Sequence, residues 1–195
     1  METVRQKVRH RRRGEPFTAK EMSSLGNRAS VDQALSRLVK DRVIERVGRG
    51  VYVRPKESPL LGRLPVSAVQ VAKAVARARQ EKLQLSGAEA ANRLGLTTQV
   101  PARTIYLTDG PSRIIRVGKQ EVELKHAAST KLVGAGTEGG LVISALYYLG
   151  REAVTPEVIG KLQGSLSFVI KNQLLRLLPH VPSWMGQSLR AICQE

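Results

Sequence analysis

Residues 31–53 read VDQALSRLVKDRVIERVGRGVYV and hold two kinds of pattern. From Val31 to Leu38 the apolar residues recur at helical spacing, which predicts an amphipathic helix that ends near Asp41. From Val43 to Val53, β-branched residues and a tyrosine flank the turn Gly48-Arg49-Gly50, which predicts a tight hairpin. A helix followed by a short basic hairpin is typical of a winged helix-turn-helix.

The face of the predicted helix opposite its apolar stripe is polar, and its side chains suit the edges of bases and the phosphates of DNA. We predict that Gln33 and Arg37 contact adenine and guanine, and that Ser36 and Lys40 contact phosphates. The remaining predicted DNA contacts are Arg28, Ser30, Arg46, Arg49, Arg113 and Arg116. An alternative is a winged helix that binds another protein.

The residues before this stretch supply the rest of such a domain. Residues 2–12 predict a basic first helix, and Thr18 with Glu21 forms a capping box for a short helix over residues 19–24. Ser30 is the predicted N-cap of the next helix. Three helices and a two-stranded wing are therefore complete by residue 53.

Residues 54–65 contain three prolines and a glycine, which predicts a linker or an extended arm. The predicted domains are a winged helix over residues 1–58, a linker over 59–65 and an α+β domain over 66–195. In the second domain we predict helices over 66–80, 87–94, 141–149, 156–162, 167–178 and 184–192, and strands over 104–108, 113–117 and 121–125. The predicted fold class is α+β, with a small antiparallel sheet and helices after the winged helix.

The composition indicates a polyanionic partner, because 32 Lys and Arg against 16 Asp and Glu give a formal charge of +16 and a pI near 10.8. Residues 1–58 and the remainder each carry +8. Aromatic residues make up only 4% of the chain, which argues against stacking on single-stranded nucleic acid. The single cysteine excludes an intramolecular disulfide and a multi-cysteine zinc site. With no apolar leader and no apolar stretch of spanning length, we expect a cytoplasmic protein that binds no membrane.

The segment Arg46–Tyr52 (RVGRGVY), the proline-rich link, residues 101–108 (PARTIYLT) and residues 112–117 (SRIIRV) together resemble the AbiEi family of antitoxins. The resemblance extends over essentially the whole chain. It implies an antitoxin that represses its own two-gene toxin-antitoxin or phage-defence operon. Symmetry of the bound protein would make the operator an inverted repeat, although two separate monomers can also occupy symmetric DNA. The resemblance also implies a nucleotidyltransferase-like toxin, which this family is classed as neutralising without a stable complex.

Catalysis finds little support in the sequence. Residues 134–139 (GAGTEG) match a dinucleotide fingerprint as a string, but they lack a preceding buried strand and a surrounding βαβ unit, so we predict a loop between helices. The three histidines have no paired carboxylate or catalytic motif. We therefore expect no enzyme, no cofactor and no metal. The alternatives are a protein that neutralises its toxin by direct binding, a general winged-helix transcription factor and, disfavoured by the missing acid-base clusters, a nucleic-acid-processing enzyme.

Overall fold

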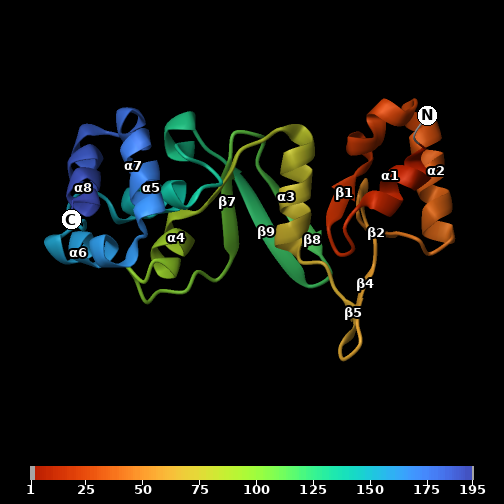
Figure 1. Ribbon diagram of the computed structural model, residues 1–195, viewed down its shortest axis with the longest axis horizontal. Coiled ribbons are helices and arrows are strands. Elements are labelled where there is room, and N and C mark those ends of the chain that lie inside the picture. Colours follow the sequence, from red (N-terminus) through yellow and green to blue (C-terminus); the bar gives the residue numbers. More distant parts are fainter. Residues whose placement is uncertain (1–2, 195) are drawn as a thin grey trace. The chain divides into compact units, whose positions relative to one another are not determined.

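A computed structural model describes residues 3–194 and has a mixed α+β fold (Figure 1). The strands form three sheets, with the orders β1-β3-β2, β4-β5 and β6-β7-β9-β8. By their contacts, the residues divide into two compact units. Unit 1 comprises residues 1–81 and 114–122, and unit 2 comprises residues 82–113 and 123–195.

The N-terminal elements, all in unit 1, alternate short helices and short strands. They are α1 (Val4–His10), β1 (Pro16–Thr18), the 3-10 helix η1 (Ala19–Leu25), α2 (Arg28–Lys40), β2 (Glu45–Gly48), β3 (Val51–Val53), β4 (Lys56–Ser58), β5 (Gly62–Leu64) and α3 (Ala68–Arg79). The elements that follow are β6 (Leu83–Leu85), α4 (Gly87–Arg93), β7 (Thr104–Thr108), β8 (Arg113–Val117), β9 (Gln120–His126), η2 (Ser129–Leu132), α5 (Glu138–Leu149), α6 (Pro156–Ser165), α7 (Phe168–Leu177), η3 (Leu178–His180) and α8 (Ser183–Cys193). The division between the units passes through β8 and β9.

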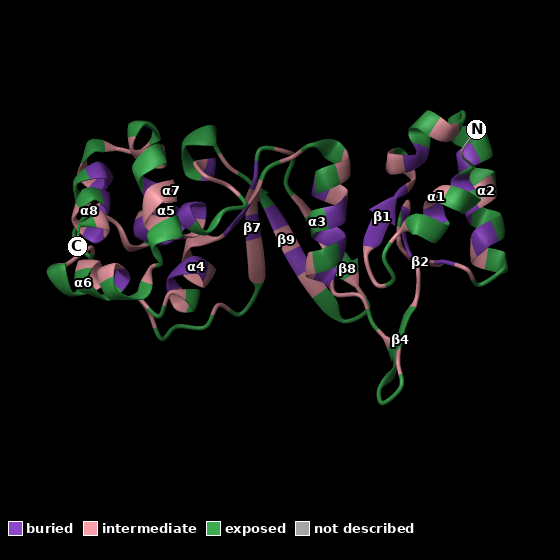
Figure 2. Ribbon diagram, viewed as in Figure 1, coloured by how far each residue is buried: buried purple, intermediate pink, exposed green. Residues whose placement is uncertain are grey.

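The strands β1 and β3 of unit 1 are buried at every position, which means that both faces of the sheet are covered (Figure 2). Phe17 and Tyr52 point to one face and join a core with residues of α1, η1 and α2. Side chains alternate along a strand, so Val51 and Val53 point to the other face. Helix α3 packs against β1 and β3, and we infer that it covers this second face.

This packing explains why the compact units differ from the predicted domains. The predicted domain boundary lies at residues 59–65, whereas the first unit continues through α3 to residue 81. Within the predicted linker, residues 62–64 form β5, which pairs with β4 in an antiparallel hairpin that joins Ser58 to Gly62 and Lys56 to Leu64. The prolines and glycine that indicated a linker lie around and within this hairpin.

The core of unit 2 is helical and centres on α5, whose Val142, Ile143 and Leu146 pack with buried residues of α6, α7 and α8. Helices α4 and α5 approach closely through small residues, since a β-carbon at Gly87 would lie 2.6 Å from the carbonyl oxygen of Ser144. The predicted strands 104–108 and 113–117 match β7 and β8. The sequence did not predict the short strands β1, β4, β5 and β6, each three residues long.

Two local predictions differ from the structure. The N-cap of α2 is Asn27, whose side chain accepts a hydrogen bond from the backbone N–H of Ser30, so the prediction of Ser30 as the cap is wrong. The capping box at Thr18 and Glu21 is confirmed, but the helix that it begins is a 3-10 helix. Residues 134–137 lie in a loop between η2 and α5, as predicted, whereas Glu138 and Gly139 already belong to the first turn of α5. Over residues 3–194, no helix has the length and apolar character needed to cross a membrane.

Candidate nucleic-acid interface

Helix α2 has one buried face and one exposed polar face. Val31, Leu35 and Leu38 are at most 4% exposed and belong to the core of unit 1. Positions 33, 36, 37 and 40 lie on the opposite side of the helix and are exposed, as the spacing of the sequence predicts. The core therefore fixes this helix with Gln33, Ser36, Arg37 and Lys40 directed to solvent.

Two predicted contact residues near the start of α2 already have partners. The hydroxyl of Ser30 donates a hydrogen bond to the carbonyl oxygen of Asn27 at 2.8 Å, as part of the helix cap. The guanidinium of Arg28 lies 3.7 Å from the carboxylate of Asp32, one turn along the helix. Ser30 thus belongs to the cap of α2, and Arg28 pairs with a residue of its own helix.

The hairpin β2–β3 presents Arg49 at its exposed turn. Gly50 has a φ of +69°, a conformation that few other residues adopt, and its carbonyl oxygen accepts a hydrogen bond at 3.0 Å from Ala19 N–H. This bond ties the turn to the start of η1. Arg46, on β2, donates from Nε to the carbonyl oxygen of Gly48 at 3.3 Å, so its side chain lies along the hairpin.

The two predicted contacts on β8 are also engaged with the protein. Arg116 donates from Nε to the Glu121 carboxylate at 2.9 Å, across the turn between β8 and β9. Arg113 is half-buried and donates from Nη1 to the carbonyl oxygen of Pro111 at 3.0 Å. A contact with DNA would compete with these bonds.

The ten predicted contact residues thus fall into two sets. Arg28, Ser30, Arg46, Arg113 and Arg116 have polar partners within the protein. In the part of the chain that the structure describes, the other five side chains make no hydrogen bond or ion pair. These five are Gln33, Ser36, Arg37, Lys40 and Arg49. They occupy the exposed face of α2 and the turn of the β2–β3 hairpin.

The positive charge of the chain is concentrated in the unit that carries this surface. Unit 1 contains 21 Lys and Arg and 9 Asp and Glu, a net charge of +12, whereas unit 2 contains 11 and 7, a net charge of +4. Dividing the chain after residue 58 instead gives two parts with the same net charge, +8 each. Grouping the residues by their contacts reveals the asymmetry, because it adds α3 and the β8–β9 turn to the N-terminal elements.

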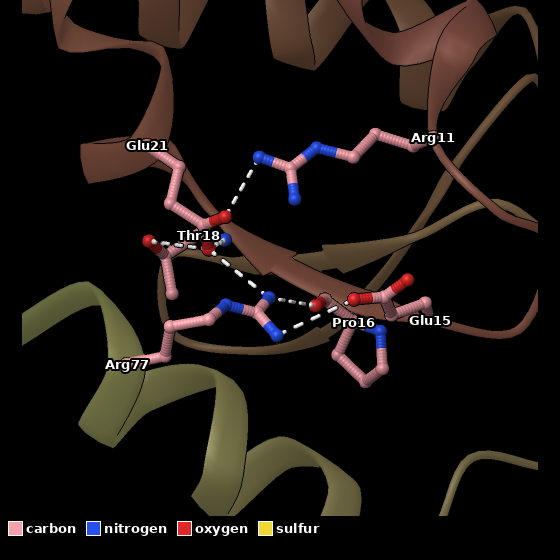
Figure 3. Close-up of polar contacts among 6 residues, drawn as sticks. All are labelled: Arg11, Glu15, Pro16, Thr18, Glu21 and Arg77. Carbon is pink, nitrogen blue, oxygen red and sulfur yellow. Dashed lines mark hydrogen bonds and ion pairs between the residues drawn. The ribbon is translucent and has the colours of Figure 1, made fainter.

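A second group of charged residues holds unit 1 together (Figure 3). Glu21 accepts a bond at 2.7 Å from Arg11 Nη2, and its carboxylate lies 3.6 Å from Arg77 Nη2. Arg77 also donates to the Pro16 carbonyl oxygen at 3.0 Å and lies 3.3 Å from the Glu15 carboxylate. These bonds link α3 to β1 and η1. Because Arg77 is 61 residues from Pro16 and 62 from Glu15, its bonds leave no local pattern in the sequence.

Within residues 3–194, no group of three or more His, Cys, Asp and Glu side chains is placed to hold a metal ion. Cys193 is half-buried and donates from Sγ to the Lys171 carbonyl oxygen at 3.5 Å. Burial raises the pKa of this thiol above its ordinary value, which lowers the fraction of reactive thiolate.

Comparison with known proteins yields a family without a described activity. The search of curated proteins found no match. Among solved structures, the RV2827C protein from Mycobacterium tuberculosis is 16% identical, with 97% of this chain and 74% of that chain covered and a TM-score of 0.41. The model of a family of unknown function, DUF6088, matches residues 3–174. The chain therefore belongs to the DUF6088 family.

Proposed function

We propose that unit 1 contains a winged helix that binds double-stranded DNA. The order α1, η1 and α2 followed by the β2–β3 hairpin, with the sheet order β1-β3-β2, supports this assignment. Helix α2 is the recognition helix in the major groove, and the turn at Arg49 is the wing that contacts the backbone. Gln33 and Arg37 read bases, while Ser36 and Lys40 contact phosphates.

The observation that carries this proposal is the set of five unengaged polar side chains on α2 and the hairpin turn. A protein surface that serves only solubility has no need to collect them on one helix face and one adjacent turn. Phosphate binding needs cations whose hydrogen-bond donors are available, and Arg37, Lys40 and Arg49 meet that need. The net charge of +12 on the same unit supplies the long-range attraction for a polyanion.

We further propose that the chain is an antitoxin that represses its own operon, on the basis of the resemblance to the AbiEi family. DNA binding by unit 1 accounts for repression, and unit 2 is assigned the antitoxin activity. Direct binding of the toxin is the second candidate mechanism. It is favoured by Phe168 and Val169 on α7, which are 75% and 65% exposed.

The DNA-binding proposal is tested with two labelled duplexes of about 30 base pairs, three helical turns. One duplex is taken from the DNA upstream of the chain's own gene, and the other has a random sequence. We expect tighter binding to the upstream duplex, and we expect Arg37→Ala to weaken this binding by roughly 1 to 3 kcal/mol, the worth of a good base contact.

The matched control is Arg151→Ala, which removes the same charge from an exposed loop of unit 2. If Arg37→Ala weakens binding to both duplexes equally, Arg37 contacts a phosphate and not a base. If Arg37→Ala and Arg151→Ala bind equally, α2 does not contact DNA and the proposal fails.

The antitoxin proposal is tested by producing the chain together with the product of its neighbouring gene and measuring growth. Rescue by the full chain, without co-purification of the two proteins, supports neutralisation without a stable complex. Co-purification that is lost in Phe168→Ser supports direct binding. If the neighbouring gene encodes no nucleotidyltransferase and its product does not slow growth, the antitoxin proposal fails and only the DNA-binding proposal remains.

A further inference from the structure

The β4–β5 hairpin carries two leucines that unit 1 does not bury. Leu60 and Leu61 are 94% and 77% exposed and lie with Pro59 in the turn between the strands. Gly62 closes the turn with a φ of +64°. The hairpin extends away from its neighbours β3 and α3 (Figure 1), and most of its residues are exposed (Figure 2).

The base of this hairpin is fixed to the proposed winged helix. Arg63 of β5 forms an ion pair with Glu45 at the start of β2. Gly14 N–H donates to the Arg54 carbonyl oxygen at 2.8 Å, and Arg13 Nη1 donates to the Pro55 carbonyl oxygen at 3.3 Å. An anchored base gives the exposed turn a defined position in unit 1.

The hairpin and the proposed wing leave opposite ends of β3. The wing turn, residues 48–50, precedes Val51, whereas β4 begins three residues after Val53. Because β2 runs antiparallel to β3 and pairs Glu45 with Val53, the β4–β5 hairpin starts at the end of the sheet remote from the wing turn. Two protrusions therefore flank the sheet that supports α2.

The size of the apolar turn indicates what kind of partner it fits. A stable protein interface buries about 800 Å² and 20 or more residues on each side, far more than the three residues Pro59–Leu61 provide. A wedge in the DNA minor groove needs only one or two apolar side chains, and Leu and Pro are among those that serve. Residues 58–62 contain no ionisable side chain, so entry between bases desolvates no charge.

We propose that Leu60 and Leu61 insert into the minor groove of DNA held by α2, where they partly unstack one base step and bend the duplex. This inference rests on the proposed function, because α2 must hold the DNA. The cost of unstacking is lowest at a flexible pyrimidine–purine step, so such a step should lie beside the sequence that α2 reads. The burial of two leucines offsets this cost.

The experiment uses the full chain with Leu60→Ser and Leu61→Ser combined, and the duplex from upstream of its gene. Energy transfer between dyes on the two ends reports bending, and 2-aminopurine at successive positions reports unstacking. We expect the unchanged chain to bend and unstack the duplex. We expect the double variant to lose both signals and to bind about tenfold more weakly, with the same salt dependence because no cation is removed.

The matched control is Val100→Ser, which replaces an exposed apolar residue of unit 2. Equal melting temperatures establish that the double variant is folded, as expected for side chains with few contacts. If the chain binds the duplex without either signal, or if the double variant retains both, the inference is wrong and DNA binding stands. A change of oligomeric state in the double variant without DNA would assign the turn to a second copy and overturn it too. If the unchanged chain binds no duplex, both the proposed function and this inference are wrong.

Discussion

Unit 1 contains two groups of arginines that differ in what their guanidinium groups contact. Arg11 and Arg77 both pair with Glu21, and Arg77 thereby joins α3 to η1, which are distant in sequence (Figure 3). Arg37 and Arg49 are exposed, and in the described part of the chain they have no polar partner. Positive charge alone therefore does not identify a binding surface. The first group should determine stability and the second should determine affinity for DNA.

The largest effect is expected from cutting the chain after residue 58. This fragment keeps all the elements of the proposed winged helix but loses α3, and with it the covering of Val51 and Val53 and the bonds of Arg77. Each newly exposed valine costs about 1.5 to 3 kcal/mol, and a small domain has little stability to lose. We expect no cooperative thermal transition by circular dichroism, in contrast to the full chain. A fragment that melts cooperatively and binds the upstream duplex as the full chain does would restore the boundary predicted from the sequence.

The next effect is expected from Glu21→Ala. Its carboxylate caps η1 by accepting from Thr18 N–H at 3.0 Å, and it is the acceptor for Arg11 at 2.7 Å. Losing the cap and leaving a half-buried arginine without its anion should lower the free energy of unfolding by about 2 kcal/mol. Urea unfolding measures this loss. Affinity for DNA should stay unchanged while the variant is folded.

Glu21→Gln is the matched control, because it keeps an oxygen that accepts from Thr18 N–H and removes the charge. Its loss should be smaller than that of Glu21→Ala. Should Glu21→Ala unfold at the same urea concentration as the unchanged chain, the bonds of Glu21 to Arg11, Thr18 and Arg77 do not stabilise unit 1.

A smaller effect is expected from Arg49→Ala. Its side chain lies at an exposed hairpin turn and makes no hydrogen bond or ion pair with residues 3–194, so stability should change by less than about 0.5 kcal/mol. If Arg49 contacts one phosphate, the slope of log affinity against log salt should fall by about 1 on every duplex. A salt titration that gives the original slope would exclude a backbone contact at this turn.

The sequence predicted the elements that have strong local signals. Helical spacing from Val31 to Leu38 located α2 and its exposed face, and alternation of residues located β7 and β8 with their observed bounds. The three-residue strands β1, β4, β5 and β6 were missed, because so short a segment shows hardly more than one period of alternation. The prolines and glycine of residues 54–65 predict a linker or an extended arm, because these residues mark turns and linkers alike, whereas β4 and β5 pair in a hairpin there.

The candidate interface could be predicted in part for a similar reason. Exposure of Gln33 and Arg37 follows from their position on the helix, which a sequence shows. The bonds of Arg113 and Arg116 follow from loop and strand geometry, which a sequence does not show. Likewise, the cover that α3 provides for β3 depends on contacts between distant residues, so the true extent of unit 1 was not predictable from a proline-rich segment.

The smallest effect is expected from Arg116→Ala, which tests whether pairing within the protein excludes a residue from the interface. Arg116 is exposed, and an exposed ion pair with Glu121 contributes about 0 to 1 kcal/mol, so unfolding should shift by no more than that. Because its guanidinium is already engaged, we expect the salt slope for DNA binding to stay unchanged.

Glu121→Gln removes the competing carboxylate and tests the same point from the opposite side. If Arg116→Ala lowers the slope by about 1, or if Glu121→Gln strengthens binding only while Arg116 is present, then Arg116 contacts phosphate despite its partner. Pairing would then fail to separate the two groups of arginines, and the interface would extend to the β8–β9 turn.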